Sequence, residues 1–228
     1  MNILSVESST ERVSFAIMIK GEVCSVKSYY KKHLASEIIV HIKHELERLC
    51  LSVSDFDAFC VGAGPGSFTG LRVSFSIVKG FAFALDKPVI SIGSFFSCAY
   101  QIKDSLDRIA VIADARRNLI YAAPFRVSGG KVIREKKEGL YVLDDFVRRY
   151  KSYTYCTYHS YLREKIELKY GGVKCYPADI WPRADVLVLL AKDYYRRGRF
   201  VSLNRLQPLY IYPADCQVRK VSIKKSGG

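Results

Sequence analysis

The 228-residue sequence lacks the marks of a secreted, membrane-spanning or zinc-binding protein. No apolar run reaches the roughly 18 to 20 residues that a membrane span requires. The N-terminus carries Glu7 where a signal peptide would need an apolar stretch behind a basic one. The seven cysteines are odd in number, and no two have Cys-x-x-Cys spacing. We therefore expect a soluble, cytoplasmic protein that has reduced cysteines and does not bind membranes.

Catalytic arrangements are also missing. No Ser/His/Asp or Cys/His set emerges from a chain that has only four histidines. His41 and His44 stand three residues apart on the polar face of a predicted helix, but a metal site would need further ligands there. The sequence therefore predicts no catalytic residue and no metal ligand.

Positive charge is what the chain has in excess, with 36 Lys and Arg against 22 Asp and Glu and a net charge of +14. A field of this sign favours polyanions through counterion release. The basic residues are scattered in short groups along the chain. Weak nucleic-acid contact and a merely solvated surface are therefore both open on charge alone.

The order of predicted elements indicates an α/β fold with two RNase H-like lobes. In the first lobe, period-2 and period-3.6 patterns predict strands at 3–8, 11–19, 23–30, 57–62 and 88–92, and helices at 35–49, at about 69–85 and from 94. Actin, Hsp70 chaperones and sugar kinases are built from two lobes of this order. We expect a first lobe over residues 1–103, a shortened second lobe of the same kind over 104–212, and a basic tail over 213–228.

A glycine-rich loop, residues 62–70, is the most specific local motif. Glycines let backbone N–H groups approach a ligand, and the following helix N-terminus favours an anion. The loop is neither a Walker A loop nor a Rossmann fingerprint. Phosphate binding and a tight structural turn both stay open. The candidate site residues, with those of the first hairpin, are Glu7, Ser8, Ser9, Thr10, Gly64, Gly66, Ser67, Thr69 and Gly70.

Several of these motifs resemble the TsaB (YeaZ) family of tRNA threonylcarbamoyladenosine biosynthesis proteins. Residues 64–72 read GPGSFTGLR, which matches the family signature residue for residue. The looser similarities are ILSVESST at 3–10, ADARRNLIY at 113–121, PRA at 182–184 and PLYI at 208–211. The resemblance covers residues 1 to 212 and implies the same RNase H-like fold.

The resemblance implies a scaffold subunit without chemistry of its own. It would support a TsaD-type catalytic subunit during threonylcarbamoyl transfer to the adenosine beside the anticodon of tRNA. A TsaE-type ATPase would join, ATP and a divalent metal would belong to the partners, and tRNA would be bound weakly. In the catalytic paralogue two histidines hold the metal, and the matching positions here are Ser94 and Cys98. A stand-alone ATPase or small-molecule kinase using Glu7, Ser67 and Thr69 is the alternative, while a peptidase has no catalytic residues behind it.

The helix predicted for residues 71–85 is apolar nearly all round. Such a helix must bury two faces, and one small sheet covers only one of them. Family members pair through their first-lobe helices, with themselves when alone or with the TsaD-type subunit. The residues expected at this interface are Ser36, Ile39, Val40, Lys43, Ser74, Val78 and Phe81.

Overall fold

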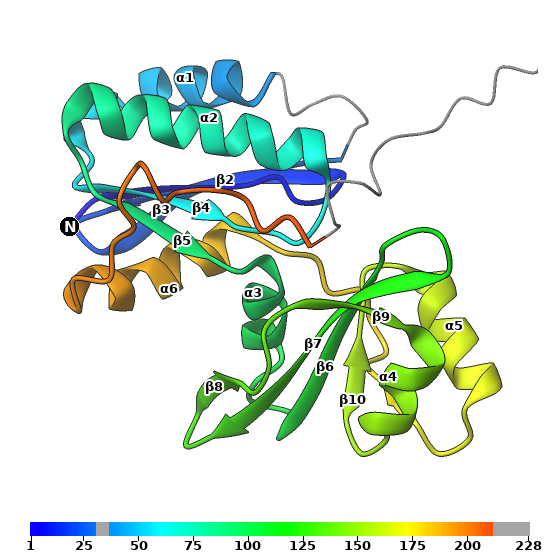
Figure 1. Ribbon diagram of the computed structural model, residues 1–228. Helices are drawn as coiled ribbons and strands as arrows, with labels where there is room; N and C mark the ends of the chain where they lie inside the picture. Colours follow the sequence, from blue (N-terminus) through cyan, green and yellow to red (C-terminus); the bar gives the residue numbers. More distant parts are fainter. Residues whose placement is uncertain (31–36, 212–228) are drawn as a thin grey trace, which may run out of the picture.

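The computed structural model describes residues 1–30 and 37–211, which form two α/β lobes, each built on one sheet (Figure 1). The first sheet has the strand order β3-β2-β1-β4-β5. The second has the order β8-β7-β6-β10-β11 when it is read from the matching edge, with β9 also pairing with β7. In both, three antiparallel strands are followed by two strands parallel to the first. The predicted RNase H-like fold with a shortened second lobe is confirmed.

The first sheet contains β1 (Ile3–Glu7), β2 (Arg12–Ile19), β3 (Glu22–Tyr30), β4 (Ala58–Gly62) and β5 (Val89–Ile92). The second contains β6 (Arg108–Asp114), β7 (Leu119–Ser128), β8 (Lys131–Arg134), β9 (Gly139–Val142), β10 (Thr154–Cys156) and β11 (Lys174–Cys175). The helices are α1 (Ile38–Arg48), α2 (Phe68–Leu85), α3 (Ser94–Gln101), α4 (Leu143–Arg149), α5 (Ser160–Lys169) and α6 (Ala184–Arg196), with a 3-10 turn at Val53–Asp55. The basic tail predicted over 213–228 lies outside the described residues.

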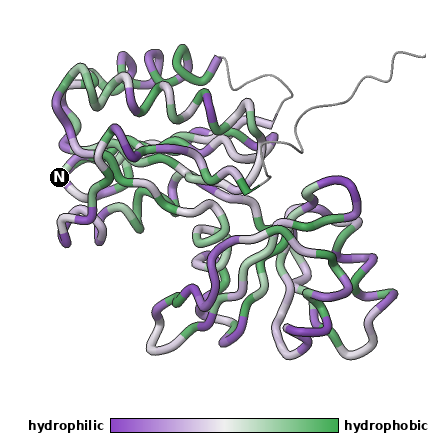
Figure 2. The backbone as a smooth tube through the Cα atoms, in the orientation of Figure 1, coloured by the Kyte–Doolittle hydropathy of each residue, from purple (hydrophilic) through white to green (hydrophobic). Residues whose placement is uncertain are grey.

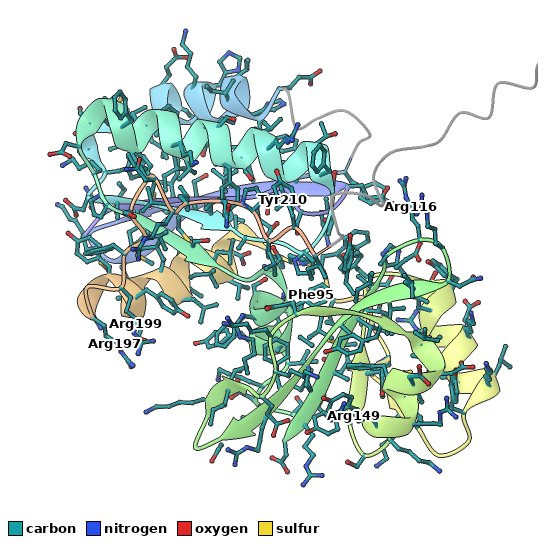
Figure 3. The ribbon with its side chains drawn as sticks, viewed as in Figure 1. Phe95, Arg116, Arg149, Arg197, Arg199 and Tyr210 are labelled. Carbon is teal, nitrogen blue, oxygen red and sulfur yellow. The ribbon has the colours of Figure 1, made fainter. Side chains whose placement is uncertain are left out.

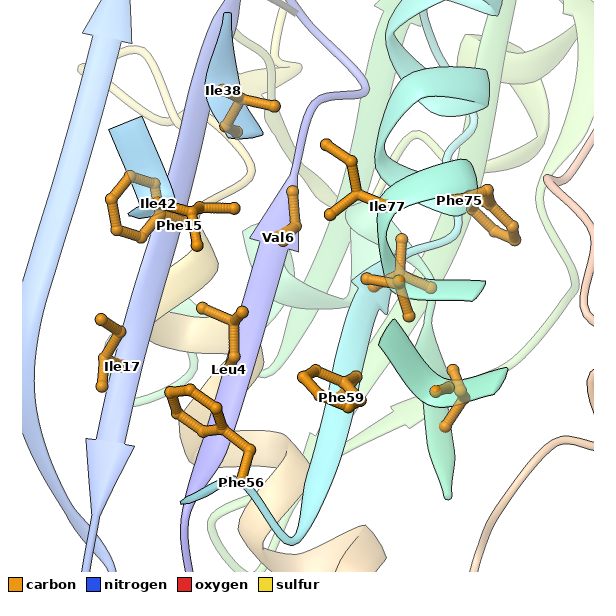
Figure 4. Packing of buried hydrophobic residues seen from close by; sticks show 14 of the residues in the cluster. Leu4, Val6, Phe15, Ile17, Ile38, Ile42, Phe56, Phe59, Phe75 and Ile77 are labelled. Carbon is orange, nitrogen blue, oxygen red and sulfur yellow. The ribbon is translucent and has the colours of Figure 1, made fainter. Parts of the chain in front are cut away.

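The first sheet is apolar on both faces because helices cover both. Leu4 and Val6 of β1 point toward α1 and α2, whereas Ile3, the first residue of β1, points toward α6. Figure 4 shows the first of these two cores, in which Phe15 of β2 packs beside Ile42 of α1. Figure 2 shows the same pattern along the chain, with hydrophobic strands and hydrophilic outer loops. Every residue of β1 and β4 is buried, including Ser5 and Glu7 of β1, as two-sided coverage of the sheet requires.

The last helix of each lobe packs on the sheet of the other lobe. Helix α3 follows β5, yet its Phe95 and Cys98 lie in the core of the second sheet with Val111. Helix α6 follows β11, yet its Leu187 lies in the core of the first sheet with Met18. In Figure 1, α6 covers the face of the first sheet opposite α1 and α2. The chain passes from the first sheet to the second near residue 103. Helix α3, before that point, covers the second sheet, and helix α6, after it, covers the first.

Helix α2 has 18 residues and is apolar enough to cross a membrane by length and composition alone. Core helices of soluble proteins pass the same test. Here α2 packs along β4, β1 and β5 of the first sheet, and its buried side chains include Leu71, Phe75 and Val78. Its apolar character therefore follows in part from its place over the middle of the sheet.

The exchange of helices predicts that one buried side chain of α6 supports the first lobe. Leu187→Ala should lower the free energy of unfolding by about 2 to 5 kcal/mol, because Leu187 is fully buried against the first sheet. Leu189→Ala on the same helix is the matched control, since Leu189 is 48% exposed. Urea denaturation followed by circular dichroism measures both. Equal effects of the two changes would contradict the packing of α6.

Candidate functional site

The first hairpin and the glycine-rich loop lie directly against each other. The backbone N–H of Ser67 donates to the carbonyl oxygen of Ser9 at 2.6 Å. The hydroxyl of Ser8 donates to the carbonyl oxygen of Gly70 at 2.7 Å. The structure therefore brings together the two segments that the sequence predicts to form one site.

The glycines of the loop permit this close approach. A Cβ atom at Gly66 would lie 2.0 Å from the carbonyl oxygen of Ser9, and one at Gly70 would lie 2.0 Å from that of Ser8. Gly64 has φ of +92°, a conformation that side chains rarely adopt. Two carbonyl oxygens of the hairpin thus occupy the space that glycine leaves open.

Much of the loop backbone is already hydrogen-bonded within the chain. The N–H of Gly64 donates to Ser94 Oγ at 3.1 Å, and the N–H of Gly70 donates to Ser67 Oγ at 3.2 Å. Thr10 Oγ1 is engaged with the backbone of Arg12. Ser67 and Thr69 are exposed. These contacts explain why the loop needs glycine: a side chain there would not fit against the hairpin. Phosphate binding by this loop stays a prediction.

Glu7 is fully buried at the end of β1 beneath the loop. Its Oε1 accepts from the N–H of Ser9 at 2.7 Å, and its Oε2 accepts from Ser94 Oγ at 2.7 Å. Burial raises the pKa of this carboxyl, while hydrogen bonds from Ser9 and Ser94 act in the opposite direction. Through Ser94, which also accepts from Gly64, the carboxyl connects β1 to the loop. This arrangement suits a support for the loop.

Ser94 and Cys98, which the family resemblance predicts to match the metal-binding histidines of the catalytic paralogue, stand one turn apart on α3. Ser94 is fully buried and engaged with Glu7. Cys98 is fully buried, its Sγ lies 3.5 Å from the carbonyl oxygen of Ile180, and burial raises its pKa well above the usual value. These residues do not fit a catalytic metal, because a hydroxyl and a buried, protonated thiol replace two imidazoles. No group of three or more potential metal ligands occurs within residues 1–30 and 37–211.

The β6–β7 hairpin of the second lobe corresponds in topology to the β1–β2 hairpin of the first. Its residues Arg116, Arg117 and Asn118 have φ of 65°, 53° and 60°, so three successive side chains adopt the left-handed conformation. The turn is tied by a hydrogen bond from the N–H of Arg116 to Asp114 Oδ1 at 2.9 Å. This hairpin contains no glycine and so does not look like a ligand-binding loop in the sequence. Its Asp-Ala-Arg sequence, residues 114–116, is the signal that marks it.

Phe68 and Arg72 of the GPGSFTGLR motif contact Tyr210 in the C-terminal segment of the described chain. The guanidinium of Arg72 lies 3.8 Å from the ring centroid of Phe68, and its Nε donates to the hydroxyl of Tyr210 at 3.3 Å. The rings of Phe68 and Tyr210 are 5.3 Å apart. Figure 3 labels Tyr210 beneath the first turn of α2. The Phe and Arg of the signature therefore have a packing role that sequence reasoning did not identify.

The predicted interface residues divide between surface and core. Ile39, Val40 and Lys43 of α1 are exposed, the first two by 45% and 48%. Phe81 is partly buried with its ring 5.5 Å from that of Phe59. Ser36 lies outside the described residues.

Ser74 and Val78 correct the interface prediction. Both are fully buried in the chain's own core, so neither can contact a partner. The reason is geometric: two apolar stripes of α2 have the same period, and periodicity does not say which one faces the sheet. The exposed side of α2 instead carries Ser76, Gly80, Phe83 and Ala84, and Phe83 is 81% exposed.

Comparisons with known proteins connect this architecture to tRNA modification. The family model described as TsaD, tRNA N6-adenosine threonylcarbamoyltransferase, matches residues 27–153. The chain is 32% identical over 139 residues to the tRNA threonylcarbamoyladenosine biosynthesis protein TsaB of Haemophilus influenzae, covering 60% of this chain and 56% of that protein. It is 28% identical over 128 residues to TsaB of Escherichia coli, covering 55% of each. The matches thus span about half the length of these curated relatives.

A solved structure shares the fold over nearly the whole described chain. YeaZ from Pseudomonas aeruginosa superposes with a TM-score of 0.79 at 23% identity, covering 92% of this chain and 99% of that one. A second Pseudomonas aeruginosa structure, described as similar to peptidase YeaZ, has a TM-score of 0.78 at 24% identity. At these identities the likeness establishes the fold.

The packing of the loop predicts opposite outcomes for two glycine changes. Gly66→Ala should lower the free energy of unfolding by about 3 kcal/mol or more, because the new methyl would meet the Ser9 carbonyl. Gly80→Ala should raise it by up to about 1 kcal/mol, since nothing lies within 4 Å and alanine is the better helix former. Urea titration of both variants provides the measurement. A neutral Gly66→Ala would show that the loop is free to move away from the hairpin.

The buried carboxyl of Glu7 predicts a particular pH dependence. Below its ordinary pKa of 4.5, Glu7 is protonated in both folded and unfolded chains. As pH rises, the unfolded chain ionises first, so the folded state loses stability until the raised folded pKa is reached. Glu7→Gln removes this loss. Its stability relative to the parent should therefore increase from pH 4.5 to pH 7.5 in thermal melts, whereas a constant difference would contradict a raised pKa.

Proposed function

The chain belongs to the TsaD family, in its TsaB (YeaZ) branch, and we propose that it acts as a non-catalytic subunit in threonylcarbamoyladenosine formation on tRNA. It would support a TsaD-type enzyme that transfers the threonylcarbamoyl group to the adenosine beside the anticodon. A TsaE-type ATPase would join the complex. ATP and the divalent metal would be bound by these partners.

The exposed apolar side of the α1–α2 layer carries this proposal. Both helices lie on the same outer side of the first lobe (Figure 1). Each keeps large apolar side chains at the surface, Ile39 and Val40 on α1 and Phe83 on α2. Exposed apolar side chains on adjacent helices favour burial against a protein partner. Small residues on α2, Gly80 and Ala84, would let a partner helix come close.

The environment of α3 supports the absence of catalysis. Ser94 and Cys98 are both turned into the chain, where each already has a hydrogen-bond partner. The α1–α2 face and these two positions together favour a supporting role over the alternative of a stand-alone ATPase or kinase. When no TsaD-type subunit is present, the same face would pair with a second copy of the chain.

Phe83→Glu tests the proposal directly. Because Phe83 is 81% exposed, the variant should fold with unchanged circular dichroism. An unpaired charge inside the interface costs several kcal/mol, so the affinity for the TsaD-type subunit should fall by about 100-fold or more. Self-association should be lost in analytical ultracentrifugation. Threonylcarbamoyladenosine formation in a mixture reconstituted with TsaD-type and TsaE-type proteins should fall in parallel.

Leu168→Glu is the matched control, because Leu168 is 89% exposed on α5 of the second lobe. This variant should keep self-association, partner binding and activity in the mixture. If Phe83→Glu behaves like Leu168→Glu, the interface lies elsewhere. If the parent chain alone modifies tRNA, or turns over ATP at about 1 per second or faster, the subunit role itself is wrong.

A further inference from the structure

The second lobe has a basic pocket at the end of its sheet away from the β6–β7 hairpin. The pocket measures about 390 Å³ and is lined by residues around the first positions of β6, β10 and β11. Arg108, Lys151 and Lys174 contribute its cationic side chains, each from a different segment. Because β6 runs from Arg108 to Asp114, the pocket and the hairpin lie at opposite ends of that strand. The pocket is thus separate from the glycine-rich loop and from the α1–α2 face.

The charge of these three side chains is largely uncompensated. Some basic residues of the second lobe pair with carboxylates, including Arg134 with Glu138 and Lys169 with Asp144. Within the described ranges, Arg108, Lys151 and Lys174 are exposed and take part in no ion pair. Asp107 is the single acidic residue of the lining. The pocket therefore keeps an excess of positive charge.

Polar and aromatic groups complete the lining. Arg108 Nη1 donates to Ser152 Oγ at 3.1 Å, and its guanidinium lies 5.9 Å from the ring centroid of Tyr153. The Tyr153 hydroxyl donates to Glu135 Oε2 at 2.5 Å, and burial together with this bond raises its pKa to about 12. The ring is thereby fixed beside the cations. Arg149, labelled in Figure 3, lies exposed toward the same end of the lobe.

Cations held on three separate segments, with the hydroxyl of Ser152 beside Arg108, suit phosphate groups. A closed site for one free phosphate would bury its donors, whereas these cations are exposed. Exposed basic side chains beside an aromatic ring suit a nucleic-acid backbone that passes over the surface. We propose that this pocket binds backbone phosphates of RNA. The inference rests on the proposed function, since that function brings tRNA to the chain.

The test compares two variants that each lose three positive charges. The pocket variant is Arg108→Gln/Lys151→Gln/Lys174→Gln. The control is Lys20→Gln/Lys87→Gln/Arg205→Gln, which removes two Lys and one Arg outside the pocket. Binding of fluorescent tRNA is measured by anisotropy over a series of salt concentrations. Thermal melts confirm that both variants are folded.

The pocket variant should bind tRNA about tenfold or more weakly at low salt. The slope of log K against log salt is negative, and its magnitude should decrease by roughly 2 to 3. The control should lose less than about threefold, as distant charges act only through the screened field. Asp107→Asn should strengthen binding, because it removes the one negative charge of the lining. Equal losses in the two triple variants, or weaker binding by Asp107→Asn, would overturn the proposal.

Free phosphates form a separate arm of the experiment. ATP and inorganic phosphate are titrated at constant ionic strength against the parent chain and the pocket variant. If ATP binding depends on the pocket while tRNA binding does not, the pocket is a nucleotide site and the proposal is wrong. The pocket variant should still bind the TsaD-type subunit, because the α1–α2 face is intact. If the pocket variant binds tRNA as well as the parent chain and still binds the partner, this inference alone is overturned. If the parent chain fails to bind the partner, the proposed function is overturned.

Discussion

The close approach of the first hairpin to the glycine-rich loop is the constraint on which the first lobe depends. The carbonyl oxygens of Ser8 and Ser9 occupy the space beside Gly70 and Gly66, and no residue with a Cβ fits there. This contact fixes where α2 begins, with Ser67 accepting the N–H of Gly70. A helix with a fixed start also has a fixed rotation. The loop therefore determines which side of α2 faces the sheet and which side faces outward.

Sequence patterns predicted most of the fold because burial in this chain follows simple periods. Strands β1 and β4 are mostly apolar and have helices on both faces, so their buried character is visible without a structure. Helices α4 and α5 and strands β9 and β11 were not predicted. They are short, and α5 keeps Leu168 exposed while only Leu162 and Ile166 are buried, which leaves a weak helical period. Which sheet α3 and α6 each cover depends on tertiary packing, and no local sequence pattern shows it.

Candidate residues could be grouped from the sequence, but their roles required geometry. The hairpin of Glu7 and the glycine-rich loop do meet, yet the side chain of Glu7 is directed to Ser94, a contact 87 residues away. The two apolar stripes of α2 look alike in sequence, and only packing placed Val78 inside and left Phe83 outside. Scattered basic residues gave no sign that Arg108, Lys151 and Lys174 would converge on one pocket, because they belong to segments far apart in the chain.

The exchange of the two helices also has a consequence for synthesis of the chain. A ribosome completes β1 to β5 well before it makes residues 184–196. During that interval one face of the first sheet, with Ile3, Met18 and Ile90, has no covering helix. Bare apolar sheet in a growing chain is prone to aggregation at the concentrations found in cells. The nascent chain must therefore be shielded, by the ribosome surface or a chaperone, until α6 emerges and closes the first lobe.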